Sequence, residues 1–190
     1  MADDTELREQ DHEQPQPEGP PVPSDEVAAA VLERFPDAVF HESHGQAVVY
    51  VARDAWHDVA AFLRDEQQFT QCLDVTAVDQ LVAPARAIPA AVAAERFEVV
   101  ANFLSHVRNR RIRVIAQVPV DDPTIASITD LYPGVNFAER ETYDLFGVEF
   151  TDHPDLARIL MPDDWLGHPL RKDDSPARVP VTFKGDPSPR

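Results

Sequence analysis

Helical spacing of apolar residues marks two stretches in the first third of the chain. Apolar residues recur every three or four positions at residues 27–35, directly after Ser24 and Asp25. A side-chain hydroxyl can accept hydrogen bonds from the free N–H groups of a first helical turn, so a helix capped by Ser24 is predicted here. A second stripe at residues 56–63 follows Asp54, which we expect to cap a second helix facing the core.

Alternation of apolar and polar residues, which is typical of strands, occupies the middle of the chain. It is clearest at residues 69–77, 97–103 and 112–118, and the continuous apolar run at 46–51 is also predicted to be a strand. The last two runs are separated by the short polar stretch 105–110 and therefore predict an antiparallel hairpin.

Prolines interrupt two further stretches. Residues 83–94 are rich in Ala and contain two prolines, which favours a long loop with room for a short helix in its second half. Asp122 and Pro123 precede three apolar residues spaced three apart, Ile125, Ile128 and Leu131. This pattern predicts a short helix with proline in its first turn.

Residues 136–150 predict a helix, a turn and a strand. Asn136 and Glu139 have the spacing of a capping box, in which two side chains bond reciprocally to backbone N–H groups of the first turn. Gly147 is expected to end the helix in the left-handed conformation, and residues 148–150 then alternate as a strand.

Beyond residue 150, charged residues are interspersed with apolar ones and with Pro154, Pro162 and Pro169. Each proline removes a backbone donor and disfavours helix in the residue before it. This part should therefore run extended or in single turns, on the chain's own sheet or on a partner.

Together these elements predict an α+β fold in two layers, with helices on one face of a mostly antiparallel sheet and an extended C-terminal segment. We expect a disordered acidic tail at 1–24, one α+β domain at 25–160 and a docking segment at 161–190. The tail has five prolines and no aromatic residue, so it is either a solvating extension or a docking arm.

Charge and cysteine content narrow the function. The chain has 34 acidic and 17 basic residues, a net charge of −17, which argues against nucleic acid as a partner. The one dense basic run, Arg108 to Arg113, lies at the predicted hairpin turn. Cys72 is the only cysteine, so thiolates of this chain alone cannot hold an iron–sulfur cluster. With no signal peptide or apolar run of membrane-spanning length, we expect a soluble, cytosolic protein.

The chain offers few residues for catalysis. The strongest alternative is a metal hydrolase that uses His153, Asp155 and His168 with the neighbouring carboxylates Asp152, Asp163 and Asp164, but these residues lack the spacing of a metal-binding helix. His41 to His44 is expected in a surface turn, and Cys72 in a strand as an inert thiol. No glycine-rich phosphate loop is present. We therefore expect no catalytic, cofactor-binding or metal site in this chain.

Charged residues near the C-terminal end can instead pair with one another. Glu141 and Asp144 lie three apart on one helical face and repel unless a cation meets them. Arg158, Arg171 and Lys172 are the candidates for that pairing, and the alternative is a solvated helix face.

The same stretch resembles the 30 kDa subunit, also designated C, of the proton-pumping NADH-quinone oxidoreductases, or respiratory complex I. The resemblance rests on these residues: Glu139, Arg140, Glu141, Tyr143, Asp144, Phe146, Gly147, His153, Pro154, Asp155, Arg158, His168, Pro169, Arg171, Lys172 and Asp173. Two departures are Asp152, where the family usually has Gly, and Ala157, where it often has Arg.

The resemblance implies a non-redox structural subunit of the peripheral arm, attached to the cytoplasmic side of the cell membrane. It implies packing against the complex I component designated D, with those designated B and I nearby, and FMN and Fe–S clusters on partner subunits alone. NADH and quinone would be handled only by the assembled enzyme, a proton-translocating respiratory-chain translocase. An equivalent subunit of a membrane-bound hydrogenase or of another donor-quinone oxidoreductase is the alternative.

Overall fold

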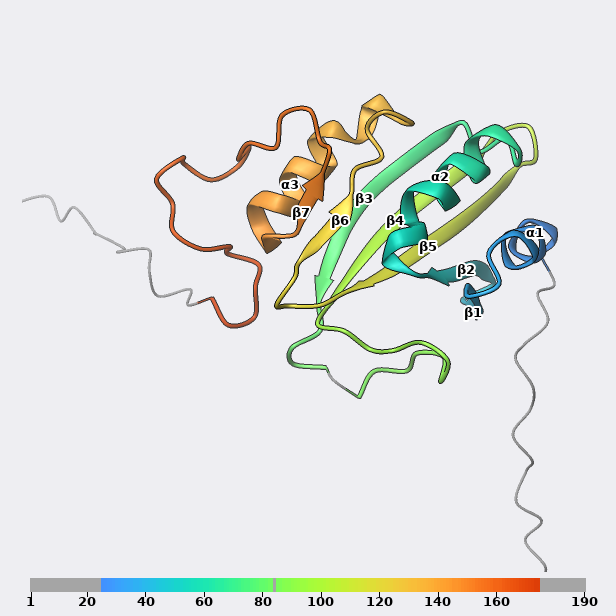
Figure 1. Cartoon of the computed structure of the whole chain (residues 1–190), viewed down its shortest axis with the longest axis horizontal. Helices are drawn as coiled ribbons and strands as arrows, with labels where there is room; N and C mark the ends of the chain where they lie inside the picture. The colour runs from blue at the N-terminus through green and yellow to red at the C-terminus, as the bar shows by residue number, and fades with distance from the viewer. Residues whose placement is uncertain (1–24, 84, 175–190) are drawn as a thin grey trace, which may run out of the picture.

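A five-stranded sheet forms the centre of the structure, a computed structural model that describes residues 25–83 and 85–174. The strand order is β1-β2-β5-β4-β3 (Figure 1). The strands are β1 (Val39–Ser43), β2 (Gln46–Val51), β3 (Gln71–Asp79), β4 (Phe97–Ser105) and β5 (Arg110–Val118). All neighbours are antiparallel except β2 and β5, which run parallel. The predicted mostly antiparallel sheet and the β4–β5 hairpin are confirmed.

Strand β1 was not predicted, because its polar residues resemble a surface turn. His41 lies within β1, and only His44 and Gly45 form the turn to β2. Both have positive φ, 53° and 72°, as a two-residue hairpin turn requires. Strand β3 is also irregular, because its register shifts between Cys72 and Asp74 and leaves Leu73 44% exposed.

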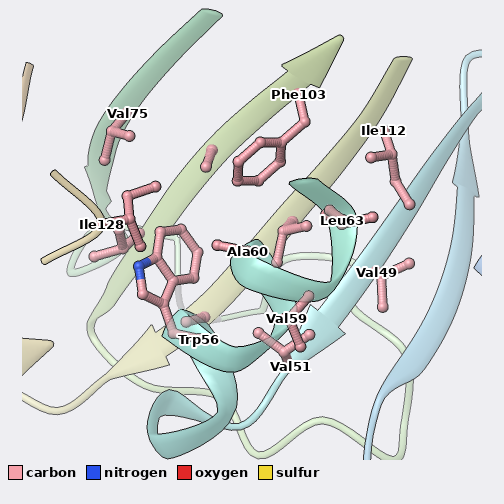
Figure 2. Close-up of a cluster of buried hydrophobic side chains, with 14 of the residues drawn as sticks. Val49, Val51, Trp56, Val59, Ala60, Leu63, Val75, Phe103, Ile112 and Ile128 are labelled. Carbon is pink, nitrogen blue, oxygen red and sulfur yellow. The ribbon is translucent and has the colours of Figure 1, made fainter. Parts of the chain in front are cut away.

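Two helices cover one face of the sheet, as predicted. They are α1 (Glu26–Arg34) and α2 (Trp56–Asp65), the latter preceded by the 3-10 turn η1 (Arg53–Ala55). Figure 2 shows the side chains of α2 pointing onto the sheet, among them Trp56, Val59, Ala60 and Leu63. These four side chains are at most 2% exposed, so the predicted helical stripe is core.

The helix caps differ from those predicted. The side chain of Asp25 caps α1 by accepting hydrogen bonds from the N–H groups of Val27 and Ala28 at 2.9 and 3.0 Å. Ser24 lies outside the described residues. Asp54 lies within η1, and no side chain caps the start of α2.

The helix predicted after Pro123 is wrong. Thr124–Ala126 forms strand β6, which pairs in parallel with β7 (Glu149–Thr151). Ile125 and Ile128 are buried as an apolar helical face would be, but here the backbone finds its hydrogen bonds on a strand distant in sequence. The spacing of apolar residues alone cannot predict that this segment pairs with a distant strand.

The loop between β3 and β4 contains no helix among its described residues, so only the predicted loop is present. Its Arg86 donates to Glu98 at 2.9 Å and to Gln117 at 2.9 Å on the outer sheet face. Ile88 and Val92 pack on an outer cluster that includes Tyr50.

Helix α3 (Asn136–Phe146) follows the 3-10 turn η2 (Pro133–Val135) and contacts β3. It ends at Gly147 with φ 71°, as predicted. The capping box is wrong: Asn136 is the first helical residue, no side chain caps it, and Glu139 points into the core.

Residues 152–174, which we term the C-terminal strap, contain neither helix nor strand. This confirms the expectation of extended chain and turns. The strap leaves β7 and returns along α3 (Figure 1). No described helix has the length and apolar character needed to cross a lipid bilayer.

Candidate functional site

Helix α3 directs its three acidic side chains into different environments. Glu139 and Asp144 are completely buried, whereas Glu141 is exposed. The two buried carboxylates are the centres of two hydrogen-bond networks that connect α3 to the rest of the chain.

Asp144 holds the first half of the strap. Its Oδ2 accepts hydrogen bonds from the backbone N–H groups of Ile159, Leu160 and Met161 at 2.8 to 3.0 Å. Its Oδ1 accepts one from the Arg158 guanidinium at 2.6 Å. Burial alone would raise the pKa of Asp144, but these four donors outweigh burial and hold the pKa below its usual value.

His168 joins the same network from the far side of the strap. Its Nδ1 donates to the backbone carbonyl of Asp144 at 2.9 Å, and its ring meets the edge of Tyr143. Burial lowers the pKa of His168, which favours the neutral ring. Arg158 also donates to the carbonyl of Gly167, so its guanidinium connects Asp144 of α3 with the part of the strap just before His168.

Arg171 caps the C-terminal end of α3. Its guanidinium donates to the carbonyls of Phe146 and Gly147 at 2.5 and 3.1 Å. These carbonyls have no partner within the helix and carry its negative dipole end, which a cation stabilises. The guanidinium also lies 5.2 Å from the centre of the Phe97 ring. Gly147 is required here, because an added Cβ would lie 2.5 Å from Arg171 and His168 atoms.

A second anchor, which sequence reasoning missed, lies at the end of β3. Asp79 is buried and accepts two hydrogen bonds from Arg96 at 3.1 and 2.8 Å and one from the backbone N–H of Lys172 at 2.9 Å. Asp173 pairs with the same Arg96 at 2.6 Å. Burial would raise the pKa of Asp79, yet Arg96 and the N–H donors lower it to about 2. The sequence did contain a signal for it: Asp79 occupies the next inward-facing position of β3 after Val75 and Ala77.

Glu139 forms the other buried network. Its carboxylate accepts hydrogen bonds from the Ser127 hydroxyl at 2.6 Å and from the backbone N–H of Ile128 at 2.9 Å. Burial raises its pKa to about 7 against the lowering effect of these two bonds. His153 Nε2 lies 3.9 Å away. Because His153 Nδ1 accepts from the N–H of Asp155, a neutral ring carries its proton on Nε2, which donates to the Asn136 carbonyl at 3.3 Å.

The predicted charge pairing therefore holds for one pair only. Asp144 pairs with Arg158, whereas Glu141 forms no ion pair within the described ranges. Arg171 bonds to backbone carbonyls instead, and Lys172 contributes its backbone N–H.

The remaining signature residues support the path of the strap. Arg140 donates to the carbonyls of Ala157 and Arg158 at 3.1 and 3.2 Å. Asp152 has φ 62°, a left-handed conformation that Gly adopts freely and that Asp tolerates better than most residues. The turn before His153 thus forms despite the departure from Gly. Pro154 and Pro169 lie in the strap beside the two histidines.

The side chains of the metal-site alternative are not brought together. His153 bonds near the start of α3, whereas His168 bonds near its end. Residues 25–83 and 85–174 contain no group of three or more His, Cys, Asp or Glu side chains placed to hold a metal ion. The Cys72 thiol donates to the carbonyl of Asp74, and burial raises its pKa to about 12, as expected for an inert thiol.

The strap presents apolar side chains outward. Leu160 is 60% exposed and Leu166 78%, with Ile159 and Leu170 partly exposed beside them. We term these four residues the strap apolar face. A segment whose polar backbone is bonded to its own domain while its leucines face solvent is suited to contact another protein.

Comparisons with known proteins point to one family. A family model described as "Respiratory-chain NADH dehydrogenase, 30 Kd subunit" matches residues 49–179. A protein from Geobacter sulfurreducens, named as the C component of NADH-quinone oxidoreductase, is 42% identical over 164 residues, 85% of this chain and 91% of that protein. One of the same name from Salinispora arenicola is 40% identical over 170 residues, 85% of this chain but only 65% of that longer protein.

Solved structures give the same result for the fold. A trypsin-resistant fragment of Nqo5 superposes with a TM-score of 0.59 at 32% identity, over 68% of this chain and 99% of the fragment. A chain of an archaeal membrane-bound sulfane sulfur reductase superposes with a TM-score of 0.58 over 87% of this chain and 97% of that chain. At 23% identity the second match shows a shared fold alone.

Proposed function

Because the chain belongs to the 30 kDa subunit family of the respiratory-chain NADH dehydrogenases, we propose that it is a structural subunit of a proton-translocating NADH-quinone oxidoreductase. It lies in the peripheral arm on the cytoplasmic side of the membrane and carries no redox group of its own. Partner subunits hold FMN and the Fe–S clusters that pass electrons from NADH to quinone. Relatives named for NADH, at about 40% identity, favour this donor over the hydrogenase alternative.

The structural role is supported by how the signature charges are used. Asp144, Arg158 and Arg171 bond to one another or to backbone groups of the strap and α3. These charged groups already form hydrogen bonds within the chain, so they are not available to bind a substrate. Their combined effect is to fix the strap on the domain.

The single observation that carries the proposal is the strap apolar face. Fully burying one leucine side chain contributes roughly 1.5–3 kcal/mol, so several leucines held in a fixed surface can contribute substantially to docking. Because the strap is already held in place before binding, less conformational entropy is lost on association. We assign this face to the D component of complex I, with the B and I components adjacent in the assembly.

Co-purification tests the proposal. An affinity-tagged chain isolated from its own membranes should bring down the D, B and I components, identified by mass spectrometry. Leu160→Asp with Leu166→Asp should lower the recovery of the D component at least about tenfold, because a charge would have to be buried in the contact.

The matched control is Val107→Asp. Val107 is 77% exposed, like Leu166 at 78%, but lies in the distant β4–β5 turn. Equal recovery with both variants would place docking on another face. Recovery of hydrogenase subunits in place of NADH dehydrogenase subunits would overturn the assignment of the electron donor.

A further inference from the structure

A cluster of positive charge stands out on this strongly acidic chain. Four of its 17 Lys and Arg residues fall within the β4–β5 turn and the start of β5: Arg108, Arg110, Arg111 and Arg113, which we term the hairpin arginines. Arg108, Arg110 and Arg111 are exposed, and no Asp or Glu lies between residues 99 and 120.

The hairpin arginines have no acidic partner within the part of the chain that the structure describes. Arg108 donates to the carbonyl of Gln67 at 2.9 Å and Arg113 to the side chain of Asn102 at 3.2 Å. Neither is in an ion pair, and Arg110 and Arg111 are in none either. By contrast, Arg53, Arg64, Arg86, Arg96 and Arg158 all pair with carboxylates.

Two hollows connect the hairpin arginines to the start of α1. One, of about 310 Å³, is lined by Asp25, Glu26 and Val27 on one side and by Arg108 and Arg110 on the other. The second, of about 430 Å³, shares Asp25 and Arg110 and extends to Arg111. Asp25, the first described residue, therefore lies at the edge of the basic surface.

The sequence that precedes Asp25 has the complementary charge. Residues 1–24 contain seven carboxylates, Asp3, Asp4, Glu6, Glu9, Asp11, Glu13 and Glu18, against the single Arg8, a net charge of 1 − 7 = −6. We propose that this acidic N-terminal segment binds the hairpin arginines of its own chain. The contact covers the one dense basic run in the sequence.

Length and tethering favour this occupant over an acidic surface on another molecule. Glu18 lies seven residues before Asp25, a reach of roughly 22 Å in the extended conformation that prolines favour. A short tether gives an effective concentration on the order of millimolar, which makes even weak charge pairing within one chain competitive with binding between chains. Because the contact is exposed, salt should weaken it: the screening length falls from about 8 Å at physiological ionic strength to about 3 Å at 1 M.

Paramagnetic relaxation enhancement tests the contact in the full chain. A nitroxide is attached through Gln10→Cys in a Cys72→Ser background, and the amide signals of residues 106–111 are followed. We expect these signals to lose at least about half their intensity in dilute buffer and to recover in about 0.5 M NaCl.

Charge reversal supplies the matched comparison. Arg110→Glu should restore the signals, whereas Arg34→Glu, which changes the net charge equally at the exposed end of α1, should leave the broadening in place. No broadening at the hairpin, or equal effects of both variants, would overturn the proposal. Broadening seen only when spin-labelled and isotope-labelled chains are mixed would assign the surface to a second copy and overturn binding within one chain.

A second measurement tests whether removing the acidic segment exposes the hairpin arginines. Deleting residues 2–18 should strengthen retention on heparin, used here as a polyanion probe, at least about threefold at low salt. Adding Arg110→Glu and Arg111→Glu to the deletion should abolish that gain. Unchanged retention after the deletion would mean that the acidic segment does not cover the arginines.

Discussion

At the scale of single residues, α3 shows how environment sets the charge of a buried carboxylate. Asp144 and Glu139 are both fully buried, five positions apart. Asp144 receives four donors, one of them a guanidinium, and its pKa falls. Glu139 receives two neutral donors, and its pKa rises to about 7. Burial has the same sign for both, so the number and charge of the donors decide the outcome.

Replacing Asp144 tests its structural role. Asp144→Ala should lower the free energy of unfolding by about 3–5 kcal/mol, because it leaves Arg158 and three N–H groups without their acceptor. Glu141→Ala, three residues away and exposed, should change it by less than about 0.5 kcal/mol. Urea unfolding measures both, and equal losses would contradict a specific role for Asp144 in holding the strap.

The raised pKa of Glu139 predicts a dependence of stability on pH. Between about pH 4.5 and pH 7 this carboxyl is ionised in the unfolded chain but protonated in the folded one. Folding therefore takes up a proton, so the contribution of Glu139 to stability is full below pH 4.5 and falls as pH rises to about 7.

Glu139→Gln removes this titration while keeping hydrogen-bond capacity. The difference in unfolding free energy, wild type minus variant, should decrease by roughly 2–3 kcal/mol between pH 5 and pH 7.5. The opposite contribution of His168, whose lowered pKa makes stability rise with pH, is common to both proteins and cancels. A difference that stays flat over this range would show that Glu139 is ionised in the folded state.

At the scale of elements, the sequence predicted those whose signals are local. The stripe of α2, the β4–β5 hairpin and the end of α3 at Gly147 each depend on residues close in sequence. Strand β6 could not be predicted, because its backbone partner, β7, lies more than 20 residues away. The capping box failed for a similar reason: Glu139 finds better donors on Ser127 and Ile128 than at its own helix start.

The sequence predicted several residues of the charged site but not which hydrogen bonds and ion pairs they form. The family motif identified Asp144, Arg158 and Arg171, and the structure brings all three to the end of α3. Asp79 and Arg96 were missed, since Asp79 ends β3 and Arg96 directly precedes β4, both far from the motif, and they join it only through Lys172 and Asp173.

Two glycines with the same backbone conformation separate the effect of conformation from the effect of packing. Gly147→Ala and Gly45→Ala both place alanine at a φ near 70°. Gly45 has open space around it, so its replacement should cost only about 1–2 kcal/mol. At Gly147 the methyl group also displaces His168 and Arg171, which should add about 1–3 kcal/mol.

Thermal unfolding of the two variants checks this difference. Gly147→Ala should also speed proteolysis within the strap, since both displaced side chains hold it on α3. Similar melting temperatures and similar proteolysis for the two variants would show that the close packing at Gly147 carries no stability.

At the scale of the whole molecule, the strap is part of the folded domain as well as a candidate docking surface. Its anchors extend from Ala157 to Asp173, across the boundary at 160 expected from the sequence. The sequence could not show this, because the prolines and charges of such a segment are equally compatible with contacts to its own domain or to a neighbour.

Truncation measures the strap's contribution to stability. A chain ending at Leu160 should stay folded on its five-stranded sheet but melt roughly 10 °C lower, since it loses the Arg171 cap and both partners of the Asp79–Arg96 pair. A chain ending at Asp174 keeps every described contact and should melt like the full chain. An unchanged melting temperature for the shorter chain would mean that the strap's bonds add no stability.

The parallel pairing of β2 with β5 constrains the order in which a nascent chain can fold. Ala47 lies beside Ile112, about 65 positions later, so β2 remains an open edge until the ribosome has released β5. At roughly 5–20 residues per second this interval lasts several seconds. The strap is made later still, so it reaches its anchors on β3, directly before β4 and on α3 only after that closure. A correctly placed strap thus forms only after the sheet is complete, and a partner that recognises the strap selects chains whose sheet is already complete.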